Sequence, residues 1–290
     1  MIIVLKNESG SFEIGGGSHL IARLQEIQGL GAPAKEQKTL IFEGQPGQML
    51  KQSRDLERTI TMSFDFFGDE RTVYNLYKII YQPVTLYFYL SNGERRQITG
   101  YCTQSTDITK IIYHEWQSVV LQFICLDPYF YDFYETKQAI SQNEDLWPNI
   151  NEDGEYLIKI PSIATKRSNE AVIYNKGDIN VYAKISLKRH NTKVILLEET
   201  EEKKIVLNNL TTEKSITLNY DISADELITI DLPNRMITSN INGDITNCIS
   251  DDTVLGDFYL QAGNNDINID VDGDIFAVAT FSNKYISVVI

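Results

Sequence analysis

The chain has 290 residues, a mass of 33.1 kDa and a formal net charge of −14, and 42% of its residues are hydrophobic. This length suits two domains, and the composition is that of a folded globular protein rather than a disordered one. The negative charge opposes the basic surface that nucleic-acid binding requires, and no apolar run reaches the length of a membrane-spanning helix, so we expect neither a nucleic-acid partner nor a membrane partner.

Strand patterns dominate the first half of the chain. Residues 1–6 predict an initial strand rather than a signal peptide, because they contain neither a basic region nor a cleavage site of small residues. Residues 58–66 alternate between apolar and polar side chains, which is typical of a half-buried strand. The Asn92-Gly93 pair predicts a hairpin turn. The other predicted strands of this half are residues 84–90, 97–103 and 116–125.

One helix is predicted among these strands. Asp69 can cap its first turn, and Pro83 ends it. Between them, apolar side chains recur at helical spacing, which predicts one buried face: Val73, Leu76, Tyr77, Ile80 and Tyr81. Residues 20–30 fit either a strand or a short helix.

Residues 31–55 differ from the rest of the first half in composition. They are rich in Gly, Pro, Gln and Lys and contain one short apolar patch, Leu40, Ile41 and Phe42. A connection of this length inside a compact domain is uncommon unless it has a role. Two interpretations stay open at this point: a surface loop, or an arm that contacts a neighbouring subunit.

An aromatic run follows the last predicted strand of the first half. After Asp127 and Pro128 come five aromatic residues: Tyr129, Phe130, Tyr131, Phe133 and Tyr134. So much aromatic surface rarely stays solvated. The run therefore either closes the core of the first domain or docks against the second domain or a neighbouring subunit.

The second half is predicted to be all-β. A polar stretch at 138–160 is the best linker, so we expect a first β domain with one helix at 1–137 and a β-sandwich at 161–290. Its turns recur about every ten residues, as in a sandwich. The predicted strands are residues 181–187, 193–197, 204–207, 215–218, 226–232, 257–260, 266–271 and 275–281.

No set of residues points to catalysis. The histidines His19, His114 and His190 lie in separate segments, and the three cysteines form no C-x-x-C pair. No nucleophile elbow and no phosphate-binding loop are present in the sequence. We therefore expect a protein that is not an enzyme, with no catalytic site, no cofactor and no metal.

One segment nevertheless resembles a calcium loop. From Asn268 to Asp274, oxygen-bearing side chains recur at alternate positions with Gly273 at the sixth, but Ala279 stands where a calcium loop has its bidentate acid. The alternative interpretation is a hairpin with an acidic outer face that turns at Asp272 and Gly273.

Several short segments, in the right order along nearly the whole chain, are similar to one protein family. In the first half these are Arg58-Thr-Ile-Thr, the helix opening near Glu70, and Cys125-Leu-Asp-Pro128 before the aromatic run. In the second half they are Tyr174-Asn-Lys-Gly-Asp178, Asn208-Asn-Leu-Thr-Thr212, Leu227-Ile-Thr-Ile-Asp231 and Phe258-Tyr-Leu-Gln-Ala-Gly-Asn264. Together they resemble the distal tail protein (Dit) family of long-tailed bacteriophages and phage-derived tail particles.

This resemblance implies a mainly β fold. The expected first domain is β-barrel-like with one helix, and the second is a galectin-like β-sandwich. It also implies a structural role in the virion tail, after synthesis in the cytoplasm of the bacterial host. Such proteins form a ring, usually a hexamer, that links the tail tube protein to tail-tip or baseplate proteins. The alternative function is a carbohydrate-binding adhesion module that recognises a host-surface glycan.

The resemblance and the side-chain chemistry suggest two groups of interface residues. The first is the apolar patch of residues 31–55 with the aromatic run, as contacts between subunits or domains. The second is a group of four acids for contact with a basic partner, which we call the acidic partner group: Asp251, Asp252, Asp257 and Asp266. Residues 221–290 contain 12 acidic residues and only two basic ones, Arg235 and Lys284. Neighbouring second domains are therefore expected to repel each other at close range. The alternative is that these acids serve solubility alone.

Overall fold

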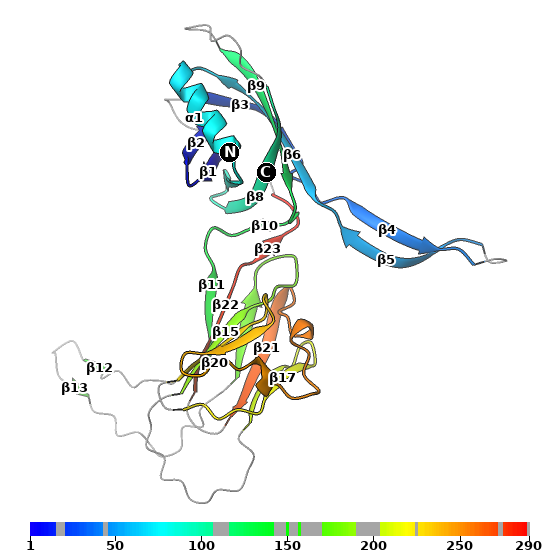
Figure 1. Cartoon of the computed structure of the whole chain (residues 1–290), viewed down its shortest axis with the longest axis vertical. Coiled ribbons are helices and arrows are strands. Elements are labelled where there is room, and N and C mark those ends of the chain that lie inside the picture. Colours follow the sequence, from blue (N-terminus) through cyan, green and yellow to red (C-terminus); the bar gives the residue numbers. More distant parts are fainter. Residues whose placement is uncertain are drawn as a thin grey trace, which may run out of the picture. The chain divides into compact units, whose positions relative to one another are not determined.

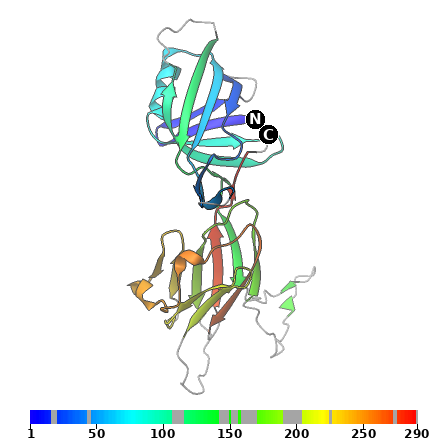
Figure 2. The same cartoon turned by 90° about the vertical axis from the view of Figure 1, so that its right-hand side faces the viewer.

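The computed structural model describes residues 1–15, 21–42, 46–106, 116–141, 149–150, 156–157, 170–189, 204–223, 226–271 and 275–288. They form two compact units, which are described separately (Figure 1; Figure 2). Unit 1 consists of Met1–Tyr134 together with Lys284–Ile290, and unit 2 of Glu135–Asn283, so unit 2 is inserted into unit 1. Among the described residues, no helix has the length and apolar character that crossing a bilayer requires.

Unit 1 is built on one curved antiparallel sheet with the strand order β2-β1-β7-β8-β9-β6-β3. Its strands are β1 (Ile2–Asn7), β2 (Gly10–Ile14), β3 (Ala22–Gln28), β6 (Arg58–Phe66), β7 (Val84–Tyr89), β8 (Arg95–Ser105) and β9 (Gln117–Cys125). The two ends of this order meet where the Gly15 N–H donates to the Ala22 carbonyl over 2.9 Å. This contact gives unit 1 the expected barrel-like form.

The predicted pattern of strand β6 is confirmed, with the predicted bounds. Ile60, Met62 and Phe64 are fully buried, whereas the residues between them are half-buried. The buried side chains meet those of β9, for example Val119 opposite Phe64, because directly opposed residues of an antiparallel pair lie on one face of the sheet. The core of unit 1 therefore lies on this face.

The predicted helix is confirmed as α1 (Glu70–Ile80), capped where the Asp69 carboxylate accepts from the Thr72 N–H at 2.9 Å. Val73, Leu76 and Ile80 are buried against the sheet, and the helix lies beside β1 and β2 in Figure 1. Tyr81 was expected on the buried face but is 90% exposed, because the helix ends at Ile80.

Other local predictions for the first half hold as well. Within the segment 20–30, Ala22–Gln28 form strand β3, which resolves the ambiguity between strand and helix. The predicted hairpin turn joins β7 and β8. The Leu90 N–H donates to the Glu94 carbonyl over 3.0 Å, and Gly93 has a φ of +85°, a conformation that glycine adopts without strain.

Unit 2 is a sandwich of two antiparallel sheets. The six-stranded sheet has the order β11 (Thr136–Ser141), β22 (Ile275–Phe281), β15 (Lys184–Arg189), β18 (Leu227–Asp231), β19 (Met236–Ser239) and β20 (Gly243–Asp244). The four-stranded sheet has the order β14 (Glu170–Asn175), β21 (Gly263–Val271), β16 (Ile205–Asn209) and β17 (Lys214–Leu218). One core joins them, with Ile185 and Ala277 from the first sheet and Leu207 and Ile269 from the second.

The remaining elements are short. β12 (Asn149–Ile150) pairs with β13 (Tyr156–Leu157), and two 3₁₀ turns, η1 (Thr246–Cys248) and η2 (Leu255–Asp257), follow β20. The strand predicted at 257–260 is therefore wrong: the chain there leaves the turn η2 and makes only one bridge, from Leu260 to Val181. The strand predicted at 193–197 lies outside the described residues.

The unit boundaries differ from the predicted ones in two places. Residues 138–141, predicted to begin the linker, belong to β11, which pairs with β22 from Thr136 opposite Phe281 onward. Residues 284–290, predicted as the end of the sandwich, belong to unit 1. Both segments are short and pair with strands more than 100 residues away, so no local pattern indicates them.

Candidate assembly surfaces

The described part of residues 31–55 forms a paired hairpin, which we call the arm, rather than an irregular loop. Strands β4 (Lys35–Leu40) and β5 (Met49–Asp55) pair only with each other among the described strands, and the hairpin runs out from unit 1 in Figure 1. Toward its tip, five apolar side chains are exposed: Leu40, Ile41, Phe42, Met49 and Leu50, at 39%, 72%, 47%, 60% and 54%. We call these five residues the arm tip. Exposed apolar side chains so close together are typical of a protein–protein contact.

The root of the arm is held by polar contacts. The Leu56 N–H donates to the Ala34 carbonyl over 2.8 Å, Lys35 lies 3.8 Å from Asp55, and the Tyr129 hydroxyl donates to the Asp55 carboxylate. Burial, together with this hydrogen bond to a carboxylate, raises the pKa of Tyr129 to about 12. Tyr129 thus connects the aromatic run to the arm.

A buried arginine lies next to this root. Arg58 is 4% exposed, and its guanidinium donates to the carbonyls of Gly29 and Pro128 at 2.6 Å and of Ile286 at 2.7 Å, and also to the carbonyl of Gly31. Its carbon lies 4.5 Å from the centre of the Phe130 ring. Burial lowers the pKa of the guanidinium. Arginine presents five donors in a planar fork, so it can join these separate backbone segments at once.

Gly29 is needed at this junction for a steric reason. Its φ is +88°, and a Cβ there would collide with the Thr59 carbonyl of β6. A glycine allows the chain to approach β6 closely before it turns into the arm.

Residues 284–288 complete unit 1. β10 (Phe130–Tyr131) pairs with β23 (Lys284–Tyr285), and Tyr285 and Val288 are buried in the core of unit 1 at 6% and 5% exposure. The Val288 N–H donates to the Leu30 carbonyl over 3.0 Å. This segment therefore packs beside the root of the arm.

A second arginine holds the same segment. The guanidinium of Arg96 lies 3.7 Å from the centre of the Tyr285 ring and 3.1 Å from carboxylates of both Glu94 and Asp132. The Tyr285 hydroxyl donates to Asp132 over 3.1 Å. This buried cation therefore has both charged and aromatic partners, which is the condition for burying it at low cost.

The aromatic run lies mostly within unit 1. Phe130 is fully buried, and Phe133 meets the rings of Tyr87 and Tyr89 edge-on at 4.9 Å and 5.2 Å. Of the five aromatic residues, only Tyr134 is largely exposed, at 77%. The structure therefore favours core closure for most of the run, and the other exposed members of the predicted interface residues are Leu40, Ile41 and Phe42 of the arm tip.

Sequence reasoning missed Arg58, Arg96 and Tyr285. A signal existed for the first of them: Arg58 falls on the buried phase of strand β6, two residues before Ile60. A charged side chain on the buried side of a strand must be satisfied by hydrogen bonds. Its presence there predicts a site where several backbone segments meet, rather than ordinary apolar packing. Tyr285 gave no signal, because its strand has two residues.

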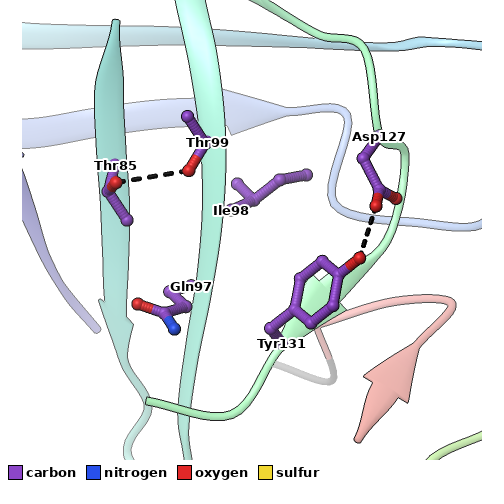
Figure 3. A pocket seen from close by; sticks show the side chains of 6 residues that line it. All are labelled: Thr85, Gln97, Ile98, Thr99, Asp127 and Tyr131. Atoms are coloured by element: carbon purple, nitrogen blue, oxygen red, sulfur yellow. Dashed lines mark hydrogen bonds between the residues drawn. The ribbon is translucent and has the colours of Figure 1, made fainter. Parts of the chain in front are cut away.

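A cavity of about 400 Å³ lies on the outer side of β7 and β8 (Figure 3). It is lined by Thr85, Gln97, Ile98, Thr99, Asp127 and Tyr131. The hydroxyls of Thr85 and Thr99 lie 3.2 Å apart, and the Tyr131 hydroxyl donates to the Asp127 carboxylate. These groups could accept a polar side chain or a small polar molecule.

The four residues of the acidic partner group come from three parts of unit 2. Asp251 and Asp252 follow the turn η1, Asp257 ends η2, and Asp266 lies on β21; all four are exposed. Asp257 lies 3.6 Å from Lys214.

The possible calcium loop is only partly described. Among the described residues, no group of three or more His, Cys, Asp or Glu side chains could hold a metal ion, and residues 272–274 lie outside them. The alternative interpretation as a hairpin is wrong, because β21 and β22 belong to different sheets of the sandwich.

Unit 2 also contains a fully buried carboxylate, Glu226. It accepts from the Tyr220 hydroxyl at 2.5 Å, from the Ser223 N–H at 2.8 Å and from the Ser239 hydroxyl. Burial alone would raise the pKa of Glu226, but the hydrogen bonds outweigh it and hold this pKa below its ordinary value. The charged form is thus the one that the fold stabilises.

This carboxylate should make unit 2 sensitive to acid. Because its pKa is lower in the folded state, its stabilisation is fully present above the unfolded pKa of about 4.3 and is lost as the pH falls through the folded pKa. We expect Glu226→Gln to lower the unit 2 melting temperature at pH 7 and to flatten its decline between pH 5 and 3. Scanning calorimetry over this range measures both. Asp221→Asn, a nearby exposed carboxyl, is the control, and an equal effect of the two substitutions would contradict the assignment.

No protein-family model matches the chain, and a search of the curated proteins finds no match. Among solved structures, the chain is similar to the Dit protein of phage SPP1, described as a paradigm of the hub adsorption apparatus in phages that infect Gram-positive bacteria. The TM-score is 0.63 at 14% identity, over 90% of this chain and 92% of that one. A chain of the phage P2 baseplate in its activated conformation with Ca matches with a TM-score of 0.45 at 11% identity, over 96% and 97%. The similarity to SPP1 Dit shows that the chain has a Dit-like fold, which confirms the predicted fold class.

Proposed function

We propose that this protein is a structural hub subunit at the distal end of a bacteriophage tail, where it links the tail tube protein to tail-tip or baseplate proteins. The observation that carries the proposal is the Dit-like fold over 90% of the chain. The SPP1 protein with this fold belongs to a hub adsorption apparatus. The arm supports the same role, because an exposed apolar tip on a paired hairpin is suited to holding a neighbouring subunit.

We further propose that the copies form a closed hexameric ring. A ring is a heterologous assembly, so each subunit needs two different surfaces that complement each other. The arm tip is one of these surfaces in our proposal, and Tyr134, the exposed member of the aromatic run, belongs to the same assembly region. Of the four acids predicted for a basic partner, Asp251, Asp252 and Asp257 form the surface that we propose for such a partner at the tail tip, because complementary charge speeds docking. The fourth, Asp266, lies on β21.

The ring and the arm can be tested together. Negative-stain electron microscopy of the purified protein should show rings, and light scattering should give six chains of 33.1 kDa. The double substitution Ile41→Asp and Phe42→Asp should remove the rings, because it places charges in a contact whose central apolar residues each contribute about 2 kcal/mol or more. Tyr81→Asp, at an exposed aromatic outside the proposed contact, is the control. Rings that persist in the arm variant would exclude the arm as the contact, and a monomeric wild-type protein would contradict the ring.

No observation favours the glycan-binding alternative. A sugar platform needs clustered aromatic rings, but the exposed aromatic side chains on the two sheets of unit 2, Tyr174 and Phe276, lie on different sheets within the described residues. Binding of the purified protein to a glycan array would favour the glycan-binding function over the hub function.

A further inference from the structure

The two outward faces of the unit 2 sandwich differ in net charge. The face of the six-stranded sheet has Lys137, Lys184 and Lys188 against Asp231 and Asp244, whereas the face of the four-stranded sheet has Glu170, Asp266 and Asp270. Alternation along each strand sends every second side chain into the core and the others outward. We call the outward side chains of the six-stranded sheet the basic face and those of the four-stranded sheet the acidic face. The net charge of −14 hides this division, because it sums over the whole chain.

The basic face is organised around strand β15. Its outward residues are Lys184, Ser186 and Lys188. Lys184 lies 3.0 Å from Asp231 and still exposes about half of its side chain, at 49%. Lys188 lies directly between Phe276 of β22 and Leu227 of β18, which are 46% and 39% exposed.

The acidic face is organised in the same way around strand β21. Its outward residues are Asp266, Asn268 and Asp270, and both aspartates are exposed. Asp266 lies directly opposite Val172 of β14, which is 59% exposed, and Tyr174 of the same strand is 52% exposed. No lysine or arginine occupies an outward position on the described strands of this sheet.

The two faces match in spacing as well as in charge. Lys184 and Lys188 are four residues apart on one strand, and so are Asp266 and Asp270, which separates each pair by about 13 Å. An uncharged polar residue lies midway in both cases, Ser186 in one and Asn268 in the other. If Lys188 meets Asp266, one of its two apolar neighbours, Phe276 or Leu227, lies beside Val172 of the second copy, because Val172 and Tyr174 both belong to β14.

We propose that the basic face of one copy binds the acidic face of a second copy of this chain. Two charge pairs set the register, and the apolar residues beside Lys188 and Asp266 add burial. The contact is heterologous, because each copy uses a different face. The hub role does not require this contact, which is a further function of unit 2. Where uniform acidic charge would make second domains repel each other, this contact makes them attract in one orientation.

A contact confined to these outward residues is smaller than the roughly 800 Å² per partner of a stable complex, so it should be weak between free copies. It becomes effective where another contact holds copies together at concentrations of about 1 mM. A site-specific cross-link therefore tests it more sharply than a binding constant does.

The test mixes two variants of the full chain, one with Ser186→Cys and one with Asn268→Cys, under mild oxidation at up to about 1 mM protein. Peptide mapping by mass spectrometry should find the disulfide between positions 186 and 268 in clear excess over the 186–186 and 268–268 products. Its yield should fall as salt rises, because screening weakens charge pairs. If general repulsion between acidic units dominated, the yield would rise with salt instead.

Charge reversal then identifies the pairs. Adding Lys188→Glu to the Ser186→Cys copy should lower the yield at least about tenfold, and adding Asp266→Lys to the Asn268→Cys copy should restore it. Lys78→Glu, on the exposed face of α1, makes the same charge change elsewhere and should have no effect. Equal melting temperatures confirm that the variants fold. Two results would overturn the proposal. One is a yield of the 186–268 disulfide no higher than that of the two symmetric products, and the other is a failure of Asp266→Lys to restore the yield lost with Lys188→Glu.

Discussion

Replacing Arg58 with Met is expected to lower the free energy of unfolding of unit 1 by at least about 3 kcal/mol. Met nearly preserves the volume of the side chain but donates no hydrogen bond. The carbonyls of Gly29, Gly31, Pro128 and Ile286 would lose their common donor at a site that is 4% exposed. Hydrogen bonds to charged groups contribute about 1.5–3 kcal/mol each, and unsatisfied buried groups add their desolvation cost.

Scanning calorimetry should show this loss as a fall of about 10 °C in the transition of unit 1, with the transition of unit 2 unchanged. Hydrogen exchange should rise at residues 29–34, 126–131 and 284–288, because these segments meet at the guanidinium. Arg54→Met is the matched control, since Arg54 makes its ion pair with Glu36 on the exposed arm, where such pairs contribute about 0–1 kcal/mol. Similar melting curves for the two variants would show that Arg58 does not hold the junction.

The second large effect concerns how unit 1 can be isolated. A fragment of residues 1–137 is expected to unfold at room temperature or to fold only loosely. It lacks Tyr285 and Val288, whose burial contributes about 1.5–3 kcal/mol each, and it also lacks the Ile286 carbonyl bound by Arg58. Together these losses approach the whole stability of a typical domain, about 5–15 kcal/mol.

Joining residues 1–134 to 284–290 through a short Gly-Ser linker should restore a stable unit 1. Tyr131 and Lys284 are antiparallel neighbours, so residues 132–134 and a few linker residues can close the connection as a hairpin does. Circular dichroism melts of the two fragments measure the difference. The same joined chain carrying Tyr285→Asp and Val288→Asp is the control and should behave like the 1–137 fragment. Equal stability of the 1–137 fragment and the joined chain would show that residues 284–288 are dispensable.

The amino-acid sequence by itself determined the local elements whose signals are short-range. Strand β6 has the predicted bounds because a sheet with one buried face imposes a period of two on its side chains. Helix α1 begins after the predicted cap Asp69, because a carboxylate satisfies the free N–H groups of a first turn. The mainly β fold class and the resemblance to the Dit family were also readable, because they rest on the order of such segments along the chain.

Contacts between distant segments were decided only by the tertiary structure. β23 has two residues and no periodicity, and its partner β10 lies more than 150 residues earlier, so nothing near Tyr285 indicates that it completes unit 1. Both faces of the arm are exposed, so its strands lack the alternation that burial produces. The difference in net charge between the two faces of unit 2 follows from register, which places Lys188 beside Phe276 and Asp266 beside Val172. Register is set by pairing across the sheets, and a one-residue shift in pairing would have turned the same lysines and aspartates into the core.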